Sequence, residues 1–195
     1  MSLAVETRST PRDIEGEALA ALDAGDRENA VTVLMSAYGT EIFRFCRHLV
    51  TDPTLAEDAH QMTFVQAYEG MERFSRRSSL RTWLFGIARH RCLDALKMTR
   101  RRGARFEAVE RLPDAPSPEL NSDDRLTARA RSRLLAECLD ELRPRIRAAV
   151  LLRFQQGLSY PELAEAVGER PATLQARVAR ALPVLRHCLE RKGAV

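Results

Sequence analysis

The stretch from Leu112 to Asp124, which reads LPDAPSPELNSDD, cannot contribute to a packed core. It contains three prolines, four acidic residues and almost no apolar side chain. Each proline restricts itself and the residue before it to extended conformations, so the stretch predicts a linker. It divides the 195 residues into a flexible N-terminus at 1–13, a first domain at 14–103, the linker at 104–125 and a second domain at 126–195.

On both sides of this acidic, proline-containing linker, apolar residues recur every three or four positions, which is the spacing of amphipathic helices. In the first domain the pattern predicts helices near 14–24, 27–50, 53–73 and 78–102. Asp52 and Pro53 mark the start of the third, because aspartate caps a helix and proline fits its first position. The fold class predicted is therefore all-α, with two small helical domains.

The third predicted helix has an apolar face and a mixed face. The residues expected in the core are Leu55, Ala59, Met62, Val65 and Met71. Asp58, Gln61 and Phe64 form a separate row, because residues three apart are neighbours on a helix surface. This row is either ordinary surface or a ridge that docks on a cationic protein helix, with the ring as its apolar anchor.

The second domain contains a helix-turn-helix pattern, which reads LSYPELAEAVGERPATLQARVARAL. Ser159 and Glu162 have the spacing of a capping box, and Gly168 is placed to end the first helix. The residues expected to pack the second helix against the first are Leu174, Val178 and Leu182. In such motifs the second helix enters the major groove of DNA, and its outward residues contact bases and phosphates. These outward residues are Thr173, Gln175, Ala176, Arg177 and Arg180. A plain helical hairpin is the alternative.

Charge is strongly segregated along the chain. Residues 1–72 carry 5 basic and 13 acidic side chains, whereas residues 73–111 carry 12 basic and 3 acidic ones. The basic part includes the helix near 78–102, which Ser78 or Ser79 can cap and which buries one apolar face. Cations beside aromatic rings suit single-stranded nucleic acid, because they neutralise phosphates while the rings stack on bases. A solvated basic face is the alternative.

The four cysteines, Cys46, Cys92, Cys138 and Cys188, are far apart and form no C-x-x-C pair. They predict neither a disulfide framework nor a zinc finger, and we expect small, buried apolar residues. Three of them lie near histidines, which leaves a metal or redox sensor as the minor alternative.

Other features of the sequence bear on chemistry and location. No glycine-rich phosphate loop or hydrolase motif occurs, so we expect no enzyme, no catalytic residue, no metal and no cofactor. No run of 18 apolar residues and no cleavable leader occurs either, which predicts a cytoplasmic protein without membrane insertion.

Together these motifs make the chain resemble the extracytoplasmic-function (ECF) sigma factors, two-domain bacterial transcription initiation subunits. The segments that resemble sigma region two read AEDAHQMTFVQAYEGMERF at 56–74 and SSLRTWLFGIARHRCLDALK at 78–97. The segment that resembles region four reads LDELRPRIRAAVLLRFQQGLSYPELAEAVGERPATLQARVARA at 139–181. The resemblance implies a sigma factor that binds core RNA polymerase, recognises −10 and −35 promoter elements and assists DNA melting.

The resemblance also assigns roles to residues. Those matching the ridge that binds core polymerase are Asp58, Gln61 and Phe64. Those matching the −10 DNA-binding surface are Phe74, Arg76, Arg77, Ser78, Ser79, Arg81, Trp83, Arg89, Lys97, Arg100 and Arg101. Those matching the −35 DNA-binding helix are Thr173, Gln175, Ala176, Arg177 and Arg180. An anti-sigma factor is a further expected partner.

The chain departs from the family in its recognition helix. Gln175 and Ala176 stand where the family commonly has lysine and serine, and Leu182-Pro183-Val184 replaces a usually basic stretch. Pro183 removes a helix hydrogen bond, so we expect a kink or an end there. This predicts a weaker grip on the −35 element, or packing of the apolar end against another helix or a regulator.

A stand-alone helix-turn-helix transcriptional regulator is the alternative function. It predicts a dimer on a palindromic site, whereas a sigma factor is expected to be monomeric or held by an inhibitor.

Overall fold

The structure is a computed structural model that describes residues 11–103 and 122–193. Its elements in chain order are α1 (Pro11–Asp23), α2 (Arg27–Leu49), α3 (Pro53–Gly70), the 3-10 turn η1 (Met71–Arg73), α4 (Leu80–Gly103), α5 (Ser122–Asp140), α6 (Pro144–Val150), the π-helical turn η2 (Leu151–Gln155), α7 (Tyr160–Val167) and α8 (Pro171–Arg191). All regular structure in the described residues is helical, which confirms the predicted all-α fold class.

The helices begin where side chains can satisfy the free N–H groups of the first turn. The carboxylate of Asp26 accepts from the backbone N–H of Asn29 at 3.0 Å, and caps α2. Asp52 caps α3 in the same way, with Pro53 in its first turn. The predicted start of the third helix is therefore confirmed.

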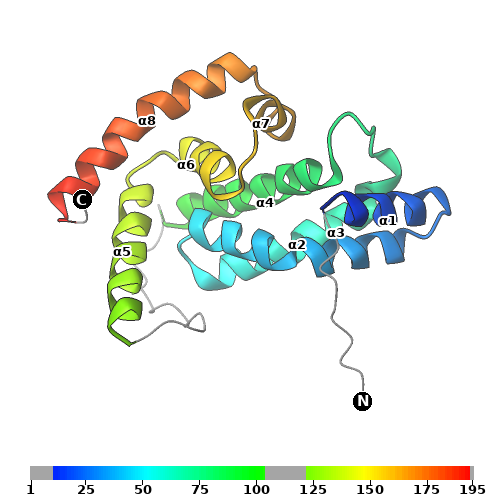
Figure 1. Cartoon of the computed structure of the whole chain (residues 1–195), viewed down its shortest axis with the longest axis horizontal. Coiled ribbons are helices and arrows are strands. Elements are labelled where there is room, and N and C mark those ends of the chain that lie inside the picture. Colours follow the sequence, from blue (N-terminus) through cyan, green and yellow to red (C-terminus); the bar gives the residue numbers. More distant parts are fainter. Residues whose placement is uncertain (1–10, 104–121, 194–195) are drawn as a thin grey trace.

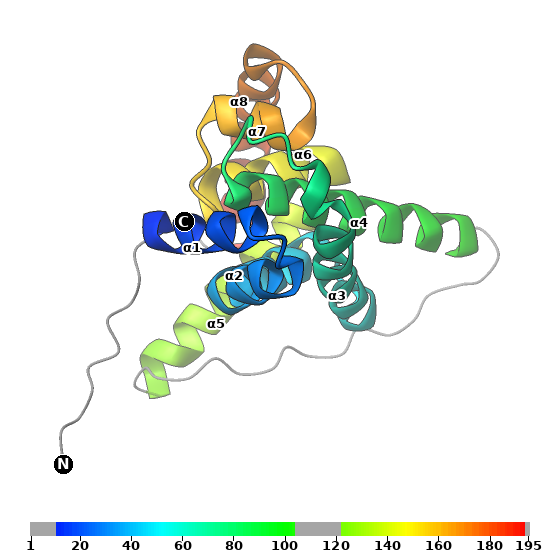
Figure 2. The same cartoon turned by 90° about the vertical axis from the view of Figure 1, so that its right-hand side faces the viewer.

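The helices form two groups that pack on one another (Figure 1). Helices α1 to α4 make a bundle, α6 and α7 lie against α4, and α8 packs on α6 and α7, while α5 stands at one end. The quarter-turn view in Figure 2 shows the same arrangement, with the last turns of α4 projecting away from the other helices. Buried apolar residues from both groups belong to one continuous cluster.

The buried face of α3 differs from the prediction. The side chains that it buries are Ala56, Ala59, Thr63, Phe64 and Ala67. Met62 and Val65, expected in the core, are 43% and 47% exposed. Helix α3 packs against both α2 and α4. Small side chains allow the closest packing, so the face with the alanines is buried and the face with Met62 and Val65 is exposed.

Pro183 does not end α8, which continues from Pro171 to Arg191. The missing N–H of Pro183 frees the carbonyl of Ala179, and both residues are on the exposed side, where water can satisfy that carbonyl. The opposite face continues to bury Ala181, Leu185 and Cys188. Leu182, expected in the helix-turn-helix core, is 42% exposed.

The expectation of isolated, unbridged cysteines is wrong for one pair. Cys138 of α5 and Cys188 of α8 form a disulfide. Their separation of 50 residues gives no local signal, because only the packing of α5 on α8 brings them together. Cys46 and Cys92 are free and buried, as predicted.

The boundary between the halves is described only in part. Helix α5 begins at Ser122, so residues 122–125 of the predicted linker are helical. The rest of that linker, 104–121, and the predicted flexible N-terminus up to residue 10 lie outside the described residues.

Candidate nucleic-acid and polymerase interfaces

An aromatic pair lies beside the loop that precedes α4. The ring centroids of Phe74 and Trp83 are 5.2 Å apart, and both rings are partly buried. Trp83 lies on Gly70, where an added Cβ would be 3.4 Å from the indole. Ser79 caps α4, because its hydroxyl oxygen accepts from the backbone N–H of Thr82 at 3.0 Å. The packing therefore brings together the two aromatic residues predicted from the sequence.

The loop itself presents arginines to solvent. Arg76 has a φ of 56°, a left-handed conformation that non-glycine residues rarely adopt, and its guanidinium pairs with Asp23 of α1. Arg77 is more exposed and lies 3.5 Å from Glu165 of α7. Ser78 is partly exposed beside them. The predicted loop residues thus form one basic and aromatic surface.

Arg81 has a different environment from its neighbours in the loop. Its Nη2 donates to the carboxylate of Glu41 at 3.1 Å and to the backbone carbonyl of Gln156 at 2.9 Å. Its guanidinium also lies 5.0 Å from the centre of the Phe85 ring. Because Gln156 follows η2, Arg81 connects the two groups of helices and is only partly exposed.

The middle of α4 is covered by α7. A Cβ on Gly86 would lie 3.0 Å from the backbone carbonyl oxygen of Ala166, which is a tighter contact than most side chains make, so glycine favours this close approach. Arg89, one turn further, has a buried Nε without a hydrogen-bond partner among the described residues. Burial lowers the pKa of Arg89, while the carboxylate of Glu169 raises it. The expectation that Arg89 projects from an open cationic face is therefore wrong.

The far end of α4 is exposed and charged. Lys97 donates to Asp94 at 2.9 Å, and this hydrogen bond is the main cause of the lowered pKa of Asp94. Arg91 and His90 also contact Asp94. The side chains of Arg100 and Arg101 lie outside the described part of the structure, although their backbone is helical.

The predicted row of Asp58, Gln61 and Phe64 is exposed only in part. Asp58 and Gln61 are exposed on α3. Phe64 is only 6% exposed, with its ring centroid 5.4 Å from that of His60, so it is a core residue and not a surface anchor. The apolar side chains beside the exposed pair are Met62 and Val65. The hydrophobic pattern had predicted both residues in the core, so it gave no indication that they lie on the surface.

The helix-turn-helix forms as predicted, except that Leu182 is exposed. Ser159 and Glu162 form the reciprocal capping box of α7, and Gly168 ends that helix with a φ of 73°. Leu174 and Val178 of α8 are buried as predicted. The exposed residues of the predicted recognition surface are Thr173, Gln175, Ala176 and Arg180. Arg177 is half-buried and pairs with Glu169.

A polar connection between the two groups was not predicted. Arg147 of α6 is 6% exposed, and it pairs with Asp140 and donates to the backbone carbonyl of Leu49 at 3.3 Å. Thr51, just after α2, donates to Asp140 at 3.1 Å. We call these four residues the latch. They are scattered along the chain, so no local pattern predicts them.

The comparisons with known proteins agree with this fold. Residues 34–102 match Sigma-70 region 2, and residues 132–182 match Sigma-70, region 4. The Probable RNA polymerase sigma-C factor of Mycobacterium bovis is 34% identical over 170 residues, which cover 86% of this chain and 88% of that protein. The ECF RNA polymerase sigma factor SigX of Bacillus subtilis is 27% identical over 165 residues, covering 84% and 85%.

Two solved structures are similar as well. CnrH, solved in complex with the cytosolic domain of CnrY, has a TM-score of 0.65 and 25% identity over 91% of this chain and 98% of that chain. RpoE of Bartonella quintana, solved in complex with the anti-sigma factor NepR, has a TM-score of 0.61 and 24% identity over 80% and 94%.

The fold and both matched regions define a transcription initiation factor of the sigma-70 type. The chain belongs to the ECF sigma factors of that family. Its function is therefore to direct transcription initiation, and a stand-alone helix-turn-helix regulator is not favoured, because such a protein has no need of region 2. Within the described residues, no helix is both long enough and apolar enough to cross a membrane.

Proposed function

We propose that this sigma factor works through two modules, residues 14–103 and 126–195, which bind core RNA polymerase and read the −10 and −35 elements of a promoter. The proposal rests on one observation above all. The exposed recognition surface of α8 and the aromatic and basic loop before α4 are carried by different groups of helices. Two separate contacts on one polymerase act at high effective concentration, so each can be weak alone.

The loop before α4 is the proposed −10 site. Phe74 and Trp83 offer ring faces for an unstacked base, and Arg76 and Arg77 offer cations for the adjoining phosphates. Trapping one unpaired base stabilises a melted duplex, because the energy of unstacking is recovered in the protein pocket. No catalytic group is needed for this step, so we propose that the chain is not an enzyme.

The start of α8 is the proposed −35 site. Arg180 is exposed and can pair with phosphate or guanine, while Gln175 can pair with adenine. Arg177 is engaged with Glu169 and must exchange this carboxylate for a phosphate in order to bind DNA. We therefore propose that the chain binds the −35 element with modest affinity.

The proposed polymerase-binding surface is the exposed side of α3. Asp58 and Gln61 supply the polar contacts, and Met62 and Val65 take the apolar role that the sequence assigned to Phe64. An apolar side chain that loses water on binding is the usual anchor of a protein interface. The proposed location is the cytoplasm, where a polymerase partner is found.

The C-terminal helices cover part of α4, and this affects which of its arginines can contact DNA. Arg81 and Arg89 lie under the C-terminal helices, so they reach DNA only after the two groups separate. We propose that binding to core polymerase favours the separated state, because each module then gains its own contact. The similar protein CnrH was solved with the cytosolic domain of another protein. By analogy, we propose an anti-sigma factor as a further partner that holds this chain away from polymerase.

Co-migration with purified core polymerase tests the polymerase surface. We expect Asp58→Ala to weaken binding about tenfold, since one interface contact of this kind contributes about 1–2 kcal/mol. Glu57→Ala is the matched control, because Glu57 is the exposed acidic neighbour on the same helix. Equal binding by the two variants would contradict the assignment.

Promoter binding by the polymerase complex tests the −35 surface. We expect Arg180→Ala to lower affinity for a fragment containing the −35 element by about 5- to 100-fold. Arg186→Ala, on the exposed far half of α8, is the control and should leave affinity unchanged. The surface is wrongly assigned if both variants bind as the unaltered chain does.

A further inference from the structure

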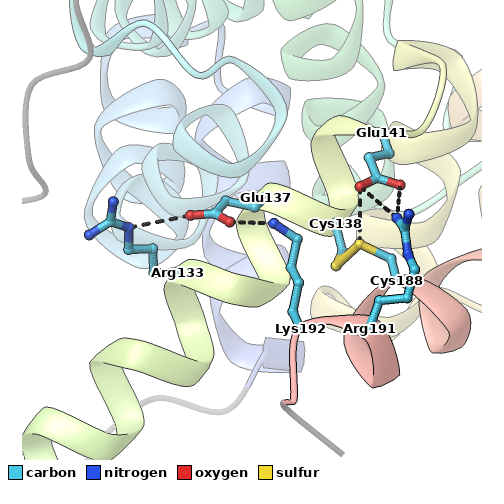
Figure 3. Close-up of polar contacts among 7 residues, drawn as sticks. All are labelled: Arg133, Glu137, Cys138, Glu141, Cys188, Arg191 and Lys192. Atoms are coloured by element: carbon cyan, nitrogen blue, oxygen red, sulfur yellow. Dashed lines mark hydrogen bonds and ion pairs between the residues drawn. A yellow bond between two sulfur atoms is a disulfide. The ribbon is translucent and has the colours of Figure 1, made fainter.

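The disulfide between Cys138 and Cys188 joins the ends of two helices (Figure 3). Cys138 is in the last turn of α5, and Cys188 is in the last turn of α8. Their Cα atoms are 5.7 Å apart, and each residue is only 1% exposed. The bond closes a loop that contains the whole helix-turn-helix.

Ion pairs surround this bond on both sides. Lys192 donates to Glu137 at 2.6 Å, and Arg191 lies 3.4 Å from Glu141 (Figure 3). These side chains are partly exposed, and exposed ion pairs contribute little to stability because water screens them. The covalent bond is therefore the strong connection at this point.

Helix α5 has few other attachments. Its main packing partners among the described helices are α8 and α6. Between residues 130 and 140, only Cys138 and Leu139 are buried, while Leu135 is 44% exposed. A helix with so little buried apolar surface opens easily when its covalent anchor is removed.

The site can accommodate the reduced form as well. A carboxylate oxygen of Glu141 lies 3.2 Å from the Cys188 sulfur, which carries no proton in the disulfide. After reduction, the Cys188 thiol can donate a hydrogen bond to this oxygen, so this thiol has an acceptor in the reduced form. The surroundings thus suit both the disulfide and the dithiol.

The end of α5 also belongs to the latch between the two groups of helices. Asp140, two residues after Cys138, contacts both Arg147 and Thr51. Arg147 in turn donates to the carbonyl of Leu49 at the end of α2. Fixing the last turn of α5 therefore fixes one partner of the latch.

We propose that Cys138 and Cys188 form a reversible redox site that controls the closed arrangement of this sigma factor. In the oxidised form, the disulfide holds α5 on α8 and keeps Asp140 in the latch. In the reduced form, α5 is released, the latch weakens and the two groups of helices separate more readily. This redox site goes beyond the proposed function. It rests on that proposal only for the cytoplasmic location, where disulfides are usually transient and redox-sensing.

The chemistry requires one oxidant and one reductant. Hydrogen peroxide takes two electrons from the thiol pair: the S–S bond forms, the O–O bond breaks, and the two thiol protons leave in two water molecules. A dithiol reverses the change, because its thiolate attacks one sulfur to give a mixed disulfide and its second thiol then displaces the protein thiolate. The dithiol ends as a disulfide, and its two protons pass to the cysteines.

The test compares the full chain after treatment with hydrogen peroxide and after treatment with dithiothreitol. Thiol titration under denaturing conditions should find two free thiols in the first form, Cys46 and Cys92, and all four in the second. Opening a cross-link of this length should lower Tm by about 10 °C. Trypsin should also cleave at the exposed Arg131 and Arg133 about tenfold faster in the reduced form.

Two variants complete the test. Cys138→Ser/Cys188→Ser should behave like the reduced form under both treatments, whereas Cys46→Ala should keep the difference between them. Four free thiols after peroxide treatment would overturn the proposal, as would equal Tm and equal trypsin cleavage in the two forms. Polymerase binding is measured separately. A chain that binds polymerase in neither form contradicts the proposed function and leaves the redox result intact.

Discussion

Gly86 is a residue at which the two groups of helices approach closely, because a side chain there meets the backbone of Ala166 and not a movable side chain. We expect Gly86→Leu to force α7 away from α4, at a cost to the closed arrangement of about 1–3 kcal/mol. Hydrogen exchange of the α7 amides should then become faster. Gly39→Ala is the control, because outside its own helix backbone an added Cβ would meet nothing nearer than Met35 Cγ, 3.9 Å away. Unchanged exchange in α7 would contradict this role.

At the scale of elements, the capping box makes the start of α7 sensitive to acid. The hydroxyl of Ser159 lowers the pKa of Glu162 below its ordinary value of 4.5. A carboxylate whose pKa is lower in the folded state than in the unfolded state adds to the free energy of unfolding at pH values above the unfolded pKa. This contribution is lost as pH falls through the folded pKa. Glu162→Gln should therefore lower the free energy of unfolding by about 0.5–1 kcal/mol at pH 7. Near pH 3 the variant and the unaltered chain should have the same free energy of unfolding.

Urea unfolding at the two pH values measures this effect. Glu165→Gln, on the same helix and outside the capping box, is the control. A loss of stability in Glu162→Gln that is equal at both pH values would mean that the carboxylate does not act through the cap.

Helix α8 contains a destabilising residue, Pro183, in its interior. Proline disfavours a helix interior by about 3 kcal/mol relative to alanine, although it also restricts the unfolded chain. Pro183→Ala restores the N–H that can donate to the carbonyl of Ala179, so we expect stability to rise by about 1–2 kcal/mol. Val184→Ala, at the exposed next position, should change stability by less than about 0.5 kcal/mol. Equal urea midpoints for Pro183→Ala and the unaltered chain would contradict the expectation.

Most elements could be predicted because their signals are local. Asp52 with Pro53, and Ser159 with Glu162, set helix starts through contacts within one turn. The buried face of α3 could not be predicted, because packing selected Ala56 and Thr63 over the larger Met62. A helix between two others buries the face that fits best, and the hydropathy of its residues does not decide this alone.

At the scale of the whole molecule, the closed arrangement was not predictable from the sequence. The disulfide joins residues 50 apart, and Arg147 reaches Leu49 across 98 residues. Such contacts exist only after both groups of helices have formed, so they leave no pattern in either one. These contacts also determine how much of the basic helix α4 is exposed. Part of its charge is covered by α7 in the closed arrangement, so we propose that the −10 surface becomes complete only when the two groups of helices separate.

Run-off transcription with purified core RNA polymerase tests the central claim most directly. Promoter fragments are supplied with and without this chain, and the lengths of the transcripts are measured. We predict transcripts from defined start sites only when the chain is present. Transcription that is the same in its absence would contradict the assignment of this chain as a promoter-directing sigma factor.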